Sequence, residues 1–137
     1  MSSSSPLLPP TTPCIIVVDD ESDLAILYKQ FITGLGFDVV SFTDSLLAFE
    51  HFRQNIDRYC LLITDLRMPG MNGIVLANKI RELNKTVKIF LVTAFAAEDL
   101  ENRPDFKAAK VDRIIQKPLK FSKLKEIIKQ DIKTHHT

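Results

Sequence analysis

Asp65 is the residue with the clearest chemical potential in this sequence. It ends the stretch Leu61–Asp65, whose apolar residues lack helical spacing, and the loop-forming residues of Pro69–Gly73 follow. This pattern predicts a buried strand that delivers one carboxylate to the edge of a parallel sheet, where open α/β folds place their sites. A single acid after a strand often only caps the next turn. Whether Asp65 has a chemical role therefore depends on which residues stand at the ends of the other strands.

Four of the five segments predicted as strands end in a reactive or metal-ligating residue, namely Asp19-Asp20, Asp65, Thr93 and Lys117. Because parallel strands point the same way, these side chains are expected to meet at one edge of the sheet. Three carboxylates gathered there would repel one another unless a cation neutralised them. Oxygen ligands without His or Cys select a hard ion, which is Mg²⁺ or else Mn²⁺ or Ca²⁺. The pattern favours Mg²⁺, which prefers one or two carboxylates together with water and a phosphate oxygen.

The other strand ends supply groups that bind a phosphoryl group. Lys117 offers an ammonium, Thr93 a hydroxyl, and Ala94 a backbone N–H next to a small side chain. Such donors stabilise the oxygens of a phosphoryl group during transfer, and the Asp65 carboxylate would be the nucleophile that forms an acyl phosphate. The alternative is a structural acid cluster with its own salt-bridging lysine, but acid clusters in clefts are more often functional.

Alternating strands and helices position these residues. The predicted strands are Cys14–Val18, Phe37–Phe42, Cys60–Asp65, Val87–Val92 and Arg113–Gln116, and helices are expected over about 22–35, 44–54, 72–83, 96–110 and 120–133. This order predicts an α/β fold, with a doubly wound five-stranded parallel sheet and helices on both faces. The second strand ends in a plain Thr43-Asp44 and is expected at the margin of the sheet.

Three local features of the helices are also predicted. Ser22 is expected to cap the first helix, and Pro104 should break or kink the helix over 96–110. The residues expected to face the core are Leu24, Leu27, Phe31 and Leu35 in the first helix and Leu46, Phe49 and Phe52 in the second.

Composition limits the remaining possibilities. The 137 residues suit one domain, and a net charge of +1 gives no bulk electrostatic case for binding nucleic acid or an anionic membrane. The apolar runs are too short to span a bilayer, and no signal peptide is visible. Cys14 and Cys60 are interpreted as small apolar strand residues in a reducing cytoplasm. Residues 1–13, rich in Ser, Pro and Thr, are predicted to be disordered, and residues 134–137 to form a C-terminal tail.

Four short stretches together resemble a known family, the receiver domain of two-component response regulators. They are Val17–Glu21, Thr64–Gly73, Val92–Ala94 and Lys117–Leu119, and their order and spacing place a receiver domain over residues 14–133. The resemblance implies a flavodoxin-like sheet with strand order 2-1-3-4-5. It also implies that Asp65 is the phosphoacceptor.

The resemblance implies roles for the neighbouring residues as well. Asp20, Asp65 and the Arg67 backbone carbonyl would bind Mg²⁺ directly, and Asp19 would act through water. Lys117 and the backbone N–H of Ala94 would contact the phosphoryl group, Thr93 would be the switch hydroxyl, and Lys117-Pro118 would be a cis peptide. The chain departs from the family pattern at Ile114, where receivers usually carry an aromatic residue, and at Arg113, where they often carry glycine.

The implied function is that of a phosphoacceptor which signals through its own surface, not an enzyme beyond its own phosphorylation and dephosphorylation. Its implied partners are a sensor histidine kinase or histidine phosphotransfer protein and an unknown downstream protein, without direct nucleic-acid or membrane binding, and no output domain is expected. An aspartyl-nucleophile phosphatase of the haloacid dehalogenase type is one alternative, but it would carry a second Asp where this chain has Arg67. An unphosphorylated pseudo-receiver is the other, but it would have lost acids that are present here.

Overall fold

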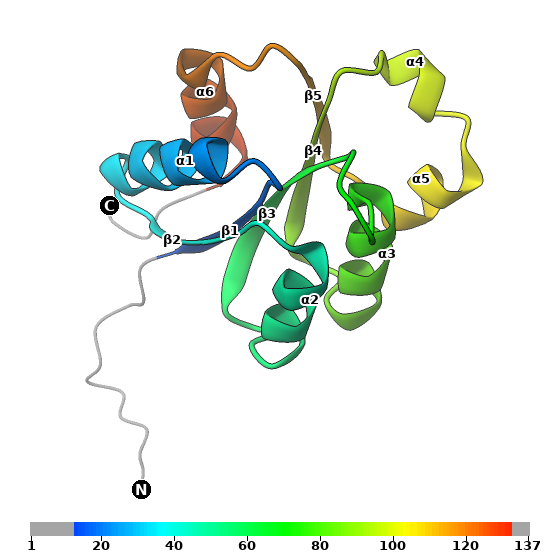
Figure 1. Cartoon of the computed structure of the whole chain (residues 1–137), viewed down its shortest axis with the longest axis horizontal. Helices are drawn as coiled ribbons and strands as arrows, with labels where there is room; N and C mark the ends of the chain where they lie inside the picture. The colour runs from blue at the N-terminus through cyan, green and yellow to red at the C-terminus, as the bar shows by residue number, and fades with distance from the viewer. Residues whose placement is uncertain (1–12, 133–137) are drawn as a thin grey trace, which may run out of the picture.

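The sheet has five parallel strands in the order β2-β1-β3-β4-β5, as predicted (Figure 1). This is a computed structural model, and it describes residues 13–132. Its strands are β1 Cys14–Val18, β2 Asp38–Phe42, β3 Tyr59–Asp65, β4 Lys88–Thr93 and β5 Arg113–Gln116. Its helices are α1 Ser22–Gly34, α2 Ser45–Arg53, α3 Gly73–Leu83, α4 Ala97–Leu100, α5 Pro104–Ala109 and α6 Phe121–Asp131. The proposed disordered segment, apart from Pro13, and the proposed C-terminal tail lie outside the described residues.

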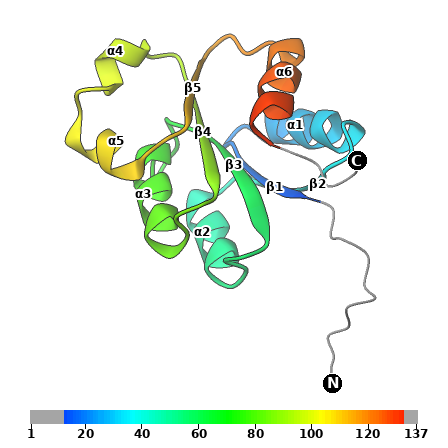
Figure 2. The same ribbon diagram turned by 180° about the vertical axis from the view of Figure 1, so that it is seen from behind.

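Helices cover both faces of the sheet, and successive residues of β1 point to opposite faces. Ile15 and Val17 pack with one layer of helices, and Ile16 and Val18 pack with the other. Figures 1 and 2 show α1 and α6 on one side of the sheet and α2 and α3 on the other. The first core includes Tyr28, Ile32, Leu124 and Ile128, and the second includes Ala48, Phe52, Leu76 and Ile80. Within residues 13–132, no helix is long and apolar enough to cross a membrane.

The start of α3 is held directly against the end of β3. Asn72 caps the helix, and its side-chain oxygen accepts hydrogen bonds from the backbone N–H groups of the next turn. Gly73 donates its backbone N–H to the Leu66 carbonyl at 2.8 Å. A Cβ on Gly73 would collide with the Asp65 carbonyl, so only glycine allows this close approach. The loop that follows Asp65 is therefore fixed at both ends.

The helix expected over 96–110 is instead two short helices, α4 and α5, joined by residues 101–103. Pro104 is the first residue of α5, a position where its missing N–H costs no helical hydrogen bond. The prediction that Pro104 interrupts this segment is confirmed. The helix ends at Lys110, which has a left-handed backbone with φ of 51°.

Two details predicted for the first two helices are wrong. The N-cap of α1 is Glu21, which makes no side-chain capping bond, and Ser22 is the first helical residue. Leu27 and Leu46 were expected inside but are 48% and 57% exposed. The neighbouring small or amphipathic residues Ala25, Tyr28, Ser45 and Ala48 are buried instead. Both helices carry apolar residues on more than one face, so only their docking on the sheet decides which face is covered.

Candidate functional site

The carboxyl ends of four strands bring the predicted site residues together. Asp65 and Thr93 are the last residues of β3 and β4, the Asp19-Asp20 pair directly follows β1, and Lys117 directly follows β5. The Lys117 ammonium lies 3.1 Å from one carboxylate oxygen of Asp65 and 3.2 Å from the other. A cavity of about 300 Å³ opens here, and we call it the acidic pocket; its lining includes Asp20, Asp65, Arg67, Thr93, Ala94 and Lys117.

The end of β4 forms backbone hydrogen bonds with the loops that follow its two neighbouring strands, β3 and β5. The Thr93 carbonyl accepts a hydrogen bond from the Lys117 backbone N–H at 2.8 Å, and the Val92 carbonyl accepts one from Leu66 at 3.0 Å. The peptide bond between Lys117 and Pro118 is cis, as the family resemblance implies. These contacts place the lysine and the β3–α3 loop on opposite sides of Thr93.

The three acids are close in space but differ in exposure. Asp19, Asp20 and Asp65 each offer a carboxylate oxygen within 4.8 Å of the others. Asp20 is exposed and lines the acidic pocket, whereas Asp19 is only 2% exposed and accepts a hydrogen bond from the Glu21 backbone N–H at 2.9 Å. Asp20 is therefore the more accessible carboxylate of the pair, and Asp19 is the buried one.

Burial perturbs the titration of this cluster. Desolvation, with a smaller contribution from the charge of Asp65, raises the pKa of Asp19 to about 6. Desolvation also raises the pKa of Asp65, although the Lys117 ammonium opposes the shift. For Lys117, burial alone would lower the pKa, but the hydrogen bond and charge of Asp65 raise it overall. Asp19 and Asp65 thus hold a proton, or favour a nearby cation, more readily than exposed carboxylates do.

The raised pKa of Asp19 predicts a pH effect on stability. Because the folded protein holds this proton up to about pH 6 while the unfolded chain releases it near pH 3.8, stability falls as pH rises through that window. We expect the loss to be on the order of 2 kcal/mol. The measurement is urea unfolding of wild type and Asp19→Asn from pH 4 to pH 7 in the presence of a chelator.

The Asn side chain keeps the oxygen that accepts from Glu21 but does not titrate. The stability of wild type relative to Asp19→Asn should therefore decrease from pH 4 to pH 7, most steeply below pH 6. Subtracting the free energy of unfolding of Asp19→Asn from that of wild type at each pH removes the contribution of all other titrating groups. A difference that does not vary with pH would contradict the assignment of this proton to Asp19.

The donor set of the acidic pocket fits Mg²⁺. The acid cluster consists of carboxylates alone, without His or Cys, which suits a hard divalent cation. Burial raises the pKa of both Asp19 and Asp65 even though the Lys117 ammonium lies nearby, so an added cation in the pocket would stabilise their charged forms. Arg67 lines the pocket, and the role predicted for its backbone carbonyl stays a prediction.

Two neighbours of the site were missed by sequence reasoning. Glu21 lines the acidic pocket and contributes a negative charge near Lys117. Phe95 donates its backbone N–H to the Thr93 hydroxyl oxygen at 3.0 Å, and the Arg67 guanidinium lies over its ring at 5.6 Å from the centroid. Glu21 extends the acidic run after the first strand, which was a usable signal. Nothing local links Phe95 to Arg67, because they belong to different loops.

Comparisons with known proteins agree with this geometry. The family model described as the response regulator receiver domain matches residues 15–129. The response regulator receiver protein CpdR of Brucella abortus is 31% identical over 104 residues, which cover 76% of this chain and 83% of CpdR. The sensor protein EvgS of Escherichia coli K12 is 35% identical over 94 residues, which cover 69% of this chain but 8% of EvgS.

Solved structures show the same fold. The response regulator TrrA of Thermotoga maritima, solved in complex with Mg²⁺-BeF, is 30% identical with a TM-score of 0.75, covering 88% of this chain and 99% of TrrA. The chemotaxis protein CheY4 of Vibrio cholerae has a TM-score of 0.79 at 18% identity, covering 89% of this chain and all of CheY4, and supports the fold alone. With the family model matching 15–129, the chain belongs to the response regulator receiver domain family.

Proposed function

We propose that this receiver domain accepts a phosphoryl group on Asp65 from the phosphohistidine of a sensor histidine kinase or histidine phosphotransfer protein. The observation that carries the proposal is the placement of Asp65. Its carboxylate lies within about 3 Å of the Lys117 ammonium and within 4.8 Å of two further acids, at the wall of an open pocket. A carboxylate, an ammonium and two further acids therefore meet at one point, which is what the proposed phosphoryl transfer requires.

The chemistry follows from the groups around Asp65. One carboxylate oxygen of Asp65 attacks phosphorus, the bond from phosphorus to the donor nitrogen breaks, and its electron pair stays on the imidazole. Lys117, which is paired with Asp65 before transfer, then donates to a phosphoryl oxygen. The Thr93 oxygen accepts from the Phe95 N–H, and its own hydrogen is free for a second phosphoryl oxygen. The Ala94 backbone N–H would serve the same oxygens.

The proposal includes a bound Mg²⁺. Asp20, Asp65 and the Arg67 carbonyl would hold it directly, and Asp19 would hold it through water. When bound, Mg²⁺ neutralises the combined negative charge of the carboxylates and the phosphoryl group. The presence of Mg²⁺-BeF in the TrrA structure supports this assignment.

The same proposal covers turnover, location and partners. Phosphorylation and dephosphorylation would be self-catalysed, so the protein is not otherwise an enzyme. The free thiols of Cys14 and Cys60 suit a reducing cytoplasm.

The similarity to a part of the sensor protein EvgS supports a sensor protein as the partner. The downstream partner would be a protein that senses the segment after β4, which is linked to the Thr93 hydroxyl through the backbone N–H of Phe95.

The decisive experiment is intact mass spectrometry after incubation with acetyl phosphate and Mg²⁺. We expect one added phosphoryl group, and none when a chelator replaces Mg²⁺. A mass that stays unchanged with the metal present would favour an unphosphorylated interaction module. Continuous release of phosphate from unrelated phosphomonoesters would instead favour the phosphatase.

Because Asp20 is exposed and Asp19 is buried, we expect substitutions of the two acids to lower Mg²⁺ affinity by different amounts. Asp20→Ala should weaken binding by about tenfold or more, because it removes an accessible direct ligand. Asp19→Ala should have a smaller effect, because Asp19 is proposed to act through water. Isothermal titration calorimetry measures both affinities.

Asp23→Ala is the matched control, since Asp23 lies in the first turn of α1, three residues after Asp20. It removes the same charge without touching the acidic pocket and should leave the affinity near that of wild type. Equal affinities for wild type and Asp20→Ala would show that Asp20 is not a metal ligand.

A further inference from the structure

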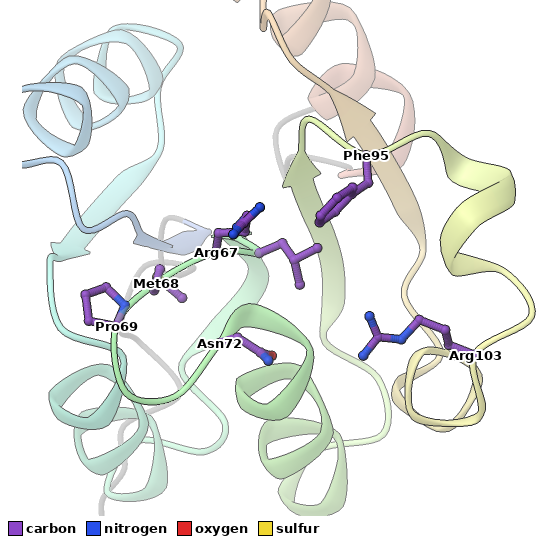
Figure 3. A pocket seen from close by; sticks show the side chains of 7 residues that line it. Arg67, Met68, Pro69, Asn72, Phe95 and Arg103 are labelled. Carbon is purple, nitrogen blue, oxygen red and sulfur yellow. The ribbon is translucent and has the colours of Figure 1, made fainter.

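A second cavity, of about 540 Å³, lies between the β3–α3 loop and the segment that follows β4. We call it the arginine cavity. Figure 3 shows Phe95 and Arg103 pointing into it from the segment after β4, with Pro69 and Asn72 on the side of the β3–α3 loop. Its volume lies in the range of sites that bind small ligands or peptide side chains. Arg103 belongs to the short turn, residues 101–103, that joins α4 to α5.

The charged groups of this cavity are both cationic. Among residues 13–132, its lining contains two arginines, Arg67 and Arg103, and no acidic residue. Arg103 uses its Nε and Nη2 for Asp105, at 3.1 and 2.8 Å, so the hydrogens of Nη1 still point to solvent or a ligand. Arg67 lies over the Phe95 ring, and within the described part of the chain its guanidinium makes no ion pair. The cavity therefore offers donors to an anion on two sides.

Apart from Asn72, the rest of the lining is apolar and offers a place for an anchor side chain. Leu66 and Met68 are buried at the cavity wall, and the Phe95 ring is 39% exposed beside them. An exposed aromatic ring next to guanidinium groups is typical of surfaces that bind peptides which carry both charged and apolar side chains.

We propose that the arginine cavity binds an acidic segment of a partner protein that carries an apolar anchor residue. Carboxylates of the segment would pair with Arg67 and Arg103, and the anchor would pack on Phe95, Met68 and Leu66. Charge complementarity selects an acidic segment over a basic one, because both guanidinium groups of the lining are positive. The binding requires neither Mg²⁺ nor a phosphoryl group, so it is independent of the proposed function.

The test uses the fluorescein-labelled peptide Asp-Glu-Leu-Phe-Asp-Glu-Gly-Gly, measured by fluorescence anisotropy in chelator without phosphodonor. Arg103→Gln should weaken binding by about tenfold, because a charge-assisted hydrogen bond is lost. Asp105→Asn should tighten binding by about threefold, because Arg103 is released from its internal partner. Peptides with Gly in place of Leu-Phe, or with Lys in place of the acids, should bind more weakly.

Arg53→Gln is the matched control. Arg53 pairs with Glu50 on α2 at 2.6 Å and its side chain is 50% exposed, against 2.8 Å and 47% for the pair of Arg103 with Asp105. This variant should bind like wild type. The proposal is supported if peptide-induced amide shifts in ¹⁵N NMR spectra cluster at Leu66, Met68 and Phe95. It is overturned if no acidic peptide binds, if the shifts lie elsewhere, or if Arg53→Gln weakens binding as much as Arg103→Gln does.

Discussion

Asp65→Asn is expected to abolish phosphorylation by acetyl phosphate and Mg²⁺ while the fold stays intact. The substitution keeps the volume of the side chain but replaces the nucleophilic carboxylate with an amide, which cannot form the acyl phosphate. Intact mass spectrometry should therefore show one added phosphoryl group in wild type and none in the variant. Circular dichroism of both proteins checks that the sheet and helices are unchanged. Labelling of Asp65→Asn at the wild-type level would refute the assignment.

Asp57→Asn is the control for this experiment, since Asp57 is an exposed acid just before β3, at the opposite end of the strand from Asp65. It should be phosphorylated like wild type.

The metal-free Asp65→Asn protein should also unfold at a higher temperature than wild type near pH 7. The raised pKa of Asp65 shows that desolvation and nearby Asp20 disfavour its charge more than Lys117 favours it. A lower thermal unfolding midpoint for Asp65→Asn than for wild type would contradict this. It would show that losing the ion pair with Lys117 costs more stability than removing the buried charge of Asp65 gains.

Arg81→Met is expected to cause the largest loss of stability, about 3–5 kcal/mol. Arg81 in α3 is buried, and its guanidinium donates to the carbonyls of Ala109 at 3.0 Å, Val87 at 2.7 Å and Lys110 at 3.0 Å. It also lies 3.4 Å from Asp112. Methionine fills similar space but leaves these acceptors without a donor. Urea unfolding followed by circular dichroism gives the free energy of unfolding.

Arg53→Met serves as the control, because Arg53 forms an ion pair with Glu50 in which both side chains are about half exposed. Its loss should cost less than about 1 kcal/mol. Arg81→Lys should lie in between, since an ammonium cannot reproduce the planar fork that reaches several carbonyls. Equal losses for Arg81→Met and Arg53→Met would show that the hydrogen bonds of the buried Arg81 guanidinium do not stabilise the fold.

The contrast between two helical segments shows how far sequence reasoning reaches. The break at Pro104 was predicted because proline lacks the N–H that a helix interior requires. The faces of α1 and α2 were partly mispredicted, because the more apolar Leu27 and Leu46 are exposed while Tyr28, Ser45 and Ala48 are buried. A local pattern identifies a breaker without knowledge of the fold, but it cannot choose between two apolar faces.

The sequence by itself determined the five strands, their parallel arrangement and the residues at their ends. Apolar runs that stop at Asp65, Thr93 or Lys117 are local features, and parallel strands necessarily place such ends at one edge. The tertiary structure alone decided that Asp19 is buried while Asp20 faces the acidic pocket. It alone also placed Arg67 over Phe95 and the Arg81 guanidinium against the end of α5. Those contacts join residues on different loops or helices, so they depend on packing between elements, which no local pattern encodes.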